Sequence, residues 1–108
     1  MLFDVRTYTC VPGGVPKAMK LYEEMGMAPQ TRHLGQPYFY GIVETGLVNS
    51  YMHIWCYESA ADRETRRKAM LADPEWQAYL KKSQEMGWLI RQENQLMTAA
   101  PFFTPLSS

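Results

Sequence analysis

The sequence has 108 residues, and its 11 Lys and Arg residues balance 11 Asp and Glu residues, so the formal net charge is +0. A chain of this length predicts one domain with a modest core, and the balanced charge excludes the basic footprint of a nucleic-acid-binding protein. No apolar run approaches the ~20 residues of a membrane span, and the first residues lack the pattern of a secretory signal. With two Cys residues and no disulfide framework, we expect a cytoplasmic protein.

The first third of the chain predicts a strand, a helix and a loop. Residues 2–10 alternate in polarity as a strand does. A helix over about 15–25 follows, because Pro16 suits a first helical position and Gly26 suits a position just past a helix end. We expect residues 27–36 to form a loop.

The next segments predict a hairpin. An aromatic and β-branched strand covers about 38–45, Thr45-Gly46 favours a turn, and residues 49–57 alternate strongly as a second strand.

The last part predicts two helices and a strand. Ser59 is a good N-cap for one helix, and Asp73-Pro74 favours the start of another, which Gly87 ends. A final strand covers 88–97, and we expect the apolar tail after it to pack.

This element order is typical of an α+β fold of the ferredoxin-like βαββαβ type, with a four-stranded antiparallel sheet and helices on one face. We expect one domain over 1–108, with a C-terminal tail at 98–108, and the first and third strands side by side in the centre of the sheet as a parallel pair.

Each central strand has one aliphatic side and one aromatic, polar side. The aliphatic sides hold Phe3, Val5 and Thr7 on the first strand and Met52, Ile54 and Cys56 on the third. The other sides hold Asp4, Arg6 and Tyr8, and Asn49, Tyr51, His53, Trp55 and Tyr57. We expect the aliphatic sides to face the helices, which leaves the aromatic sides open to a ligand or another subunit.

His53 is the candidate general acid or base, because the ordinary pKa of histidine lies near neutrality. The candidate ligand-binding residues share its side of the sheet: Asp4, Arg6, Tyr8, Asn49, Tyr51, Trp55 and Tyr57. The same residues also suit a plain dimer interface, with His53 as a hydrogen-bonded interface residue and Asp4–Arg6 as a partly exposed ion pair.

Other chemistries find little support in the sequence. Neither the His nor the Cys residues have metal-ligand spacing, and no cofactor-binding motif is present, so we expect no metal and no cofactor. Cys10 and Cys56 fall on opposite sheet faces by parity, which predicts two free thiols. The basic run from Arg63 to Lys68 suggests a solvated helix face.

Several segments together resemble the NIPSNAP family: RTYT near the start, GLVNSYMHIWCY, then DRETRRKAM, DPEWQAYL and the closing PFFTP. The resemblance covers nearly the whole chain. It implies a ferredoxin-like fold that pairs into a dimeric α+β barrel. It implies no established catalytic residues, because the family has no agreed activity.

Two functions remain open. The first is small-molecule binding or cofactor-free catalysis in a cleft on the sheet face of a dimeric barrel, with His53 in proton transfer. The second is a non-catalytic homodimeric interaction or adaptor module, which eukaryotic relatives in the family resemble. A cavity with converging polar groups favours the first, and a filled interface favours the second.

Overall fold

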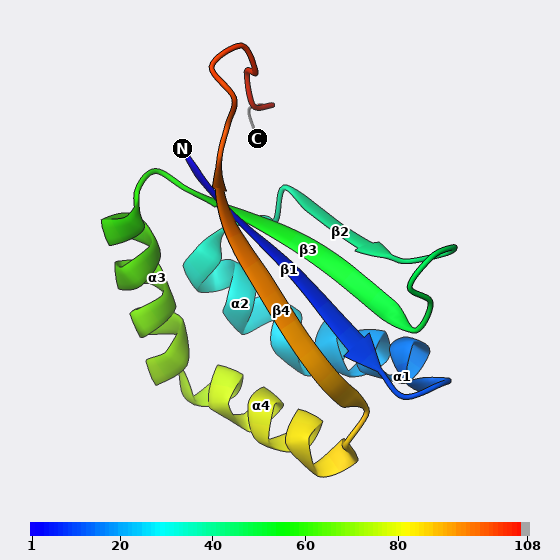
Figure 1. Cartoon of the computed structure of the whole chain (residues 1–108). Coiled ribbons are helices and arrows are strands. Elements are labelled where there is room, and N and C mark those ends of the chain that lie inside the picture. Colours follow the sequence, from blue (N-terminus) through cyan, green and yellow to red (C-terminus); the bar gives the residue numbers. More distant parts are fainter. Residues whose placement is uncertain (107–108) are drawn as a thin grey trace.

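Four antiparallel strands form one sheet in the order β2-β3-β1-β4, shown in Figure 1. The computed structural model describes residues 1–106. The elements are β1 (Leu2–Cys10), α1 (Gly14–Leu21), η1 (Tyr22–Gly26), α2 (Met27–Leu34), β2 (Phe39–Ile42), β3 (Ser50–Tyr57), α3 (Ala60–Ala72), α4 (Pro74–Met86) and β4 (Leu89–Thr98). The α+β class and the ferredoxin-like antiparallel sheet are confirmed.

The direction predicted for the two central strands was wrong. β1 and β3 are neighbours, but they run antiparallel, with Arg6 opposite His53. The helical crossover after β1 returns the chain parallel to β1 in β2, and the hairpin into β3 then reverses it. The third strand therefore has to oppose the first.

The first helical segment is longer than predicted and runs through residues 14–34 with a π-helical turn, η1, in its middle. The predicted loop over 27–36 was wrong, because Gly26 does not end the helix. Gly26 is instead a point of close approach: a Cβ there would lie 2.8 Å from Tyr22 Cδ1 and 3.1 Å from Tyr79 Cδ1. The wider π turn ends at Gly26, three residues before Pro29, which cannot donate a backbone hydrogen bond.

The boundaries of the later helices follow the predicted caps. Ser59 Oγ accepts a hydrogen bond from the backbone N–H of Asp62 at 3.1 Å and starts α3. Asp73 Oδ1 accepts one from the N–H of Glu75 at 2.9 Å, and Pro74 takes the first position of α4. Gly87, with φ 68°, ends α4 in the left-handed conformation.

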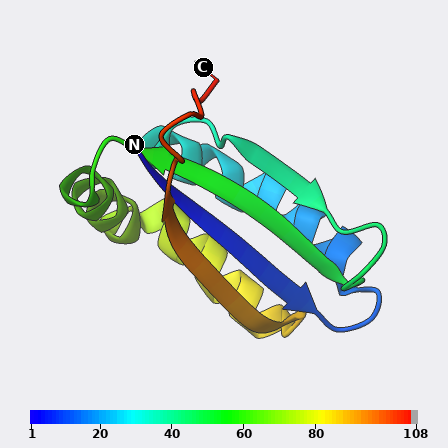
Figure 2. The same cartoon turned by 45° about the horizontal axis from the view of Figure 1, so that its top comes forward.

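The sequence prediction for the two sides of the sheet was wrong: the helices cover the aromatic side, which was expected to be open. Tyr51, His53, Trp55 and Tyr57 are all at most 4% exposed and face the helices. Trp55 and Tyr57 join Leu34, Met70 and Trp76 in the main hydrophobic cluster. Large rings with polar tips therefore fill the core between the sheet and the helices. Figure 2 shows helices lying behind the sheet.

The opposite face of the sheet has no helix on it. Val5, Met52, Ile54 and Cys56 are half-buried there, and Phe39 is 52% exposed. The centre of this open face is therefore largely apolar.

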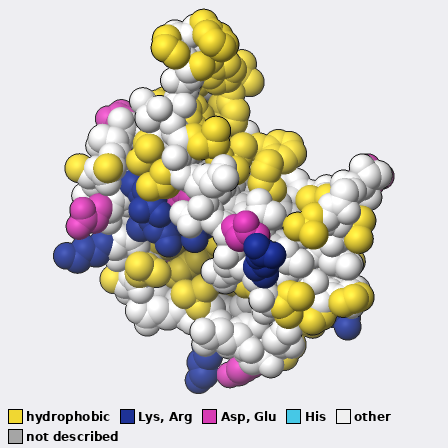
Figure 3. Space-filling model, in the orientation of Figure 1, with side chains coloured by type: hydrophobic (Ala, Val, Ile, Leu, Met, Phe, Trp, Pro, Cys, Tyr) yellow, Lys and Arg dark blue, Asp and Glu magenta, His cyan; other side chains and the backbone are white. Residues whose placement is uncertain are grey.

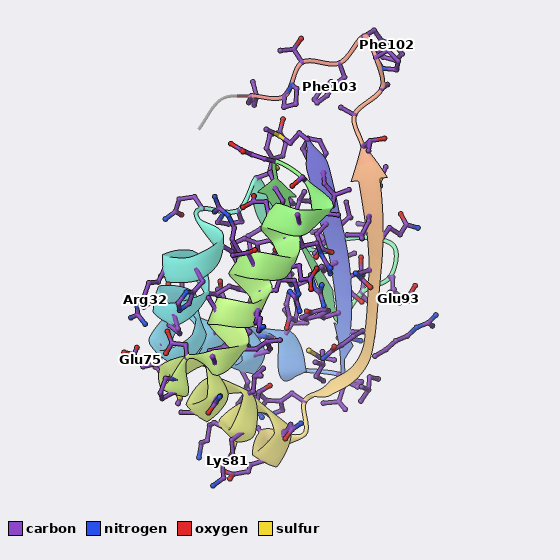
Figure 4. The ribbon with its side chains drawn as sticks, turned by 90° about the vertical axis from the view of Figure 1, so that its left-hand side faces the viewer. Arg32, Glu75, Lys81, Glu93, Phe102 and Phe103 are labelled. Atoms are coloured by element: carbon purple, nitrogen blue, oxygen red, sulfur yellow. The ribbon has the colours of Figure 1, made fainter. Side chains whose placement is uncertain are left out.

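The C-terminal tail does not pack on the body as predicted. Phe102 is 90% exposed and Phe103 is 48% exposed, and both extend beyond the two layers in Figure 4. Figure 3 shows the same segment as a group of hydrophobic side chains at one end of the molecule.

Among residues 1–106, none of the helices has the length and apolar composition needed to cross a membrane.

Candidate functional site

A cleft of about 460 Å³ lies between the helix-covered face of the sheet and the helices. This volume is within the range of small-molecule sites. Its floor is formed by the buried rings of Tyr51 and His53 on β3, and its helical wall includes Trp76 and Tyr79 on α4. Its rim includes the exposed side chains of Leu71, Leu80, Gln84 and Gln92. The space exists because α3 and α4 diverge from the sheet, and β4 is exposed along almost its whole length.

A buried carboxylate organises the charges beside the cleft. Asp4 is 0% exposed, and its Oδ2 accepts hydrogen bonds from Arg6 Nη1 and Arg63 Nε, each at 3.1 Å. Asn94 Nδ2 donates to its Oδ1 at 3.3 Å. Burial alone would raise the pKa of Asp4, but Arg6, Asn94 and Arg63 outweigh it and hold that pKa below its usual value.

Asp4 also orients Arg6 in the cleft wall. Arg6 Nε donates a hydrogen bond to the Tyr8 hydroxyl at 2.9 Å, while its Nη1 is held by Asp4. With two of its donor groups committed, the guanidinium is fixed in position, and both Arg6 and Tyr8 line the cleft. The expected Asp4–Arg6 pair is present, with Asp4 buried and the Arg6 side chain 14% exposed, and it belongs to a network that positions a cation.

His53 is held as a neutral ring with a defined tautomer. Trp55 Nε1 donates a hydrogen bond to His53 Nδ1, and an indole nitrogen can only donate. Nδ1 is thus an acceptor, so the proton of the neutral imidazole resides on Nε2. Nε2 is buried and has no hydrogen-bond partner among residues 1–106.

The surroundings of His53 disfavour its charged form. Burial, together with the positive charges of Arg6 and Arg67, lowers the pKa of His53 to about 3, although Asp4 opposes the shift. Near neutral pH the ring is therefore neutral and a hydrogen-bond donor at Nε2.

Tyrosine rings surround the imidazole. Tyr40 on β2 stacks on His53 with a centroid distance of 4.7 Å and an interplanar angle of 9°, and it stacks on Tyr22 at 5.0 Å. Tyr8 meets His53 edge-on at 4.9 Å. Burial raises the pKa of Tyr40 and Tyr51 well above the usual range, so their hydroxyls stay protonated at neutral pH.

The structure divides the predicted site residues into two groups. Arg6, Tyr8, Tyr51 and His53 line the cleft. The others lie outside its lining: Asp4, Trp55 and Tyr57 are buried beside it, and Asn49 precedes β3.

Asn49 has a structural role at the end of the hairpin. It has φ 68°, and its carbonyl oxygen accepts a hydrogen bond from the backbone N–H of Cys10 at 2.8 Å. Cys10 and Cys56 are free thiols as predicted.

Sequence reasoning missed part of the lining. Arg67, which was assigned to a solvated helix face, lines the cleft, and Arg63 of the same run binds the buried Asp4. Arg63, Arg67 and Met70 are spaced i, i+4, i+7, which is one stripe of a helix. Because Met70 is 1% exposed, that stripe faces inward, and this spacing was the available signal.

Gln30 and Tyr40 also went unassigned. Gln30 is 5% exposed and its Oε1 accepts a hydrogen bond from the Tyr22 hydroxyl at 2.6 Å. No pattern marked it, because the helix containing it was predicted to be a loop. Tyr40 pairs with His53 across β2 and β3, and the hairpin register predicts that pairing only once the loop length is known.

A comparison with family models matches residues 3–104 to NIPSNAP. The chain belongs to the NIPSNAP family. The predicted resemblance is thereby confirmed over nearly the entire chain. A comparison with functionally curated proteins finds no match.

Solved structures of other NIPSNAP proteins have the same fold. A protein from Agrobacterium tumefaciens is 36% identical, with a TM-score of 0.90, covering 99% of this chain and 100% of that one. A NIPSNAP domain protein from Burkholderia xenovorans, described as uncharacterized, is 29% identical with a TM-score of 0.89, covering 96% of this chain and 99% of that one.

A more distant likeness concerns the fold alone. A putative antibiotic biosynthesis monooxygenase from Nitrosomonas europaea is 6% identical, with a TM-score of 0.65, covering 92% of this chain and 98% of that one. At this identity the match confirms the ferredoxin-like architecture of this NIPSNAP protein and nothing about its chemistry.

Proposed function

We propose that this NIPSNAP protein binds a small carbonyl-bearing organic molecule in the cleft between its sheet and its helices. The observation that carries the proposal is a buried donor at the cleft floor, His53 Nε2, which has no partner among residues 1–106. A buried donor without an acceptor costs about 1–3 kcal/mol, which a ligand oxygen would recover on binding.

The chemistry of the lining supports an oxygen-rich ligand. Arg6 and Arg67 supply positive charge, His53 supplies a neutral donor, and tyrosines supply hydroxyls and ring faces. Within residues 1–106 the cleft lining holds no carboxylate, so it offers no acidic side chain as a general base. The arrangement suits polarisation of a bound carbonyl, by stabilising negative charge on its oxygen.

Blocking the cleft tests this function. Ser83 lies in the lining on α4, so Ser83→Phe should fill part of the space, while Lys82→Phe places the same ring on the exposed neighbouring position. We expect small aromatic carbonyl compounds that raise the melting temperature of the wild type and of Lys82→Phe to lose that effect on Ser83→Phe. Equal stabilisation of both variants would remove the cleft as the binding site.

We further propose that a second copy of the chain covers the open face, as in the dimeric barrel that the family resemblance implies. An aliphatic sheet face formed by Val5, Met52 and Ile54, with Phe39 beside it, favours an apolar partner. A two-fold axis makes such a patch self-complementary. The residues earlier expected at this interface, Tyr51, Trp55 and Tyr57, are buried against the helices of their own chain.

Sedimentation velocity at micromolar concentration tests the dimer. A wild-type monomer under those conditions would contradict it and leave the cleft proposal untouched.

A further inference from the structure

The hydrogen-bond donor at the cleft floor is fixed by the fold before any ligand arrives. Trp55 Nε1 donates a hydrogen bond to His53 Nδ1, and Tyr40 stacks on the imidazole with an interplanar angle of 9°. Trp55 is 0% exposed and His53 is 2% exposed, so the fold encloses both rings. Nε2–H is therefore a preorganised donor, which selects ligands that present an acceptor.

The charges around this donor do not cancel. Three guanidinium groups, those of Arg6, Arg63 and Arg67, approach the covered face, and Asp4 is the carboxylate that pairs with two of them. Arg67 makes no ion pair within residues 1–106. One negative charge thus faces three positive charges, and the local excess is positive.

The walls of the cleft favour a flat body. Tyr22 and Tyr40 stack at 5.0 Å with an interplanar angle of 25°, and Tyr40 and Tyr51 lie at 12° to each other. Stacked rings cover each other's faces and leave their edges free, and a row of parallel edges forms a flat wall that suits a conjugated skeleton more than a bulky saturated one.

From this arrangement we propose that the ligand of the cleft is a planar conjugated organic anion. Its charged oxygen accepts the hydrogen bond of His53 Nε2–H between the guanidiniums of Arg6 and Arg67. The inference rests on the proposed small-molecule function of the cleft and specifies the class of ligand.

Matched pairs of probes test the ligand class. Cinnamate and cinnamamide share a planar skeleton and differ in charge, as do benzoate and benzamide. For the wild type we expect each carboxylate to bind at least about tenfold more tightly than its amide, measured by ligand-observed NMR titration at neutral pH. Inorganic phosphate serves as a probe of charge without a planar body, and we expect it not to displace cinnamate at equal concentration.

Two variants separate Arg67 from charge in general. Arg67→Gln should reduce the preference for carboxylate to below about threefold, because carboxylate binding loses more than amide binding. Arg66→Gln, on the same helix but paired with Asp62 at 2.9 Å and outside the lining, should keep the full preference. Equal losses in both variants would overturn the role of Arg67.

NMR spectroscopy tests the role of His53 as a hydrogen-bond donor. Long-range ¹⁵N–¹H correlation spectra should show a protonated Nε2 and an unprotonated Nδ1, and the Nε2 signal should shift when cinnamate is added. A protonated Nδ1, or an Nε2 signal that cinnamate does not move, would contradict the proposal even if both variants fold.

The outcomes also distinguish a failure of the proposed ligand class from a failure of the proposed function. If amides and carboxylates bind equally and Ser83→Phe abolishes both, the cleft is the site and the anion inference fails. If Ser83→Phe affects neither, or if no probe binds, the proposed function itself fails. Displacement of cinnamate by phosphate would show an anion site without selectivity for a planar body.

Discussion

The two faces of the sheet differ in both chemistry and surroundings. The covered face holds a carboxylate, guanidiniums, an imidazole and large aromatic rings, and much of it is almost fully buried. The open face holds Val5, Met52 and Ile54, which are only half-buried. The intuitive rule that aliphatic side chains face inward fails here, because the interior contains a cleft as well as a core.

Several of the polar groups on the covered face are paired within the fold. Asp4 has three donors, and the Tyr22 hydroxyl donates to Gln30. Each pairing removes the penalty of burying a polar atom, while the rings contribute large apolar area. Substitutions on the covered face should therefore affect mainly the stability of the fold, and substitutions on the open face should affect mainly association.

The largest loss is expected at Trp76, which joins α4 to the covered face. Its side chain is 7% exposed within the main hydrophobic cluster. Trp76→Ala should lower the free energy of unfolding by about 3–5 kcal/mol, as for other buried aromatic residues. Chemical denaturation measures this change, and Lys82→Ala on the exposed side of α4 is the control, with an effect within about 0.5 kcal/mol. An unchanged midpoint for Trp76→Ala would place the anchor of α4 elsewhere.

The buried carboxylate comes next. Asp4→Asn leaves Arg6 and Arg63 beside an uncharged amide, so the free energy of unfolding should fall by about 3 kcal/mol. Glu93→Gln breaks the exposed pair with Arg91, whose two side chains are 67% and 53% exposed, and should cost less than about 1 kcal/mol. Similar costs in both variants would show that the network of Asp4 is not a buried one.

His53 should make the covered face sensitive to acid. Its folded pKa, about 3, lies below the ordinary value of 6.5, so the fold favours the neutral ring. The contribution is complete above pH 6.5 and decreases as the pH falls from 6.5 toward 3, by about 2 kcal/mol at pH 5.

A variant isolates this contribution. His53→Gln keeps an acceptor for Trp55 but does not titrate, so its stability should fall less than that of the wild type between pH 7 and pH 5. Denaturation curves at the two pH values give the difference, and parallel curves would contradict a buried neutral His53.

The smallest effect on folding and the largest on association are expected on the open face. Ile54→Glu places a charge on the aliphatic strip, which should cost less than about 1 kcal/mol in the monomer but shift a dimer to monomer. Thr65→Glu, on the exposed side of α3, is the control. Sedimentation that shows the same assembly for both variants would remove the open face as the interface. Trp55→Glu does not test this point, because Trp55 is fully buried in its own chain.

Local patterns in the sequence predicted the helices and strands better than they predicted how these elements pack against one another. The caps at Ser59 and Asp73 were correct because capping depends on a few neighbouring residues. Alternation correctly grouped Arg6, Tyr8 and His53 on one face, because side chains in a strand alternate with period two.

Alternation cannot tell which of two faces the helices cover, since both faces have the same period. Here the covered side consists of aromatic rings and polar groups, and some of the polar groups pair with residues distant in sequence, such as Asp4 with Arg63. The contribution of α2 to the core was missed for another reason, because Gly26 has the composition of a helix end and the geometry of a close contact.

The π turn η1 makes the number of residues in the first helical segment as important as their identity. The backbone N–H of Met27 bonds to the carbonyl of Tyr22, five residues back, so this turn contains one residue more than an α-helical turn. Deleting Glu23 or Glu24, both exposed, would convert this turn to an α-helical one and keep Tyr22 and Gln30 close to their present relative orientation, whereas a deletion inside α1 or α2 would rotate everything after it by about 100° about the helix axis. Across related sequences, a one-residue gap should therefore be tolerated at residues 22–26 and not within α1 or α2, so this turn is where the length of the segment can vary.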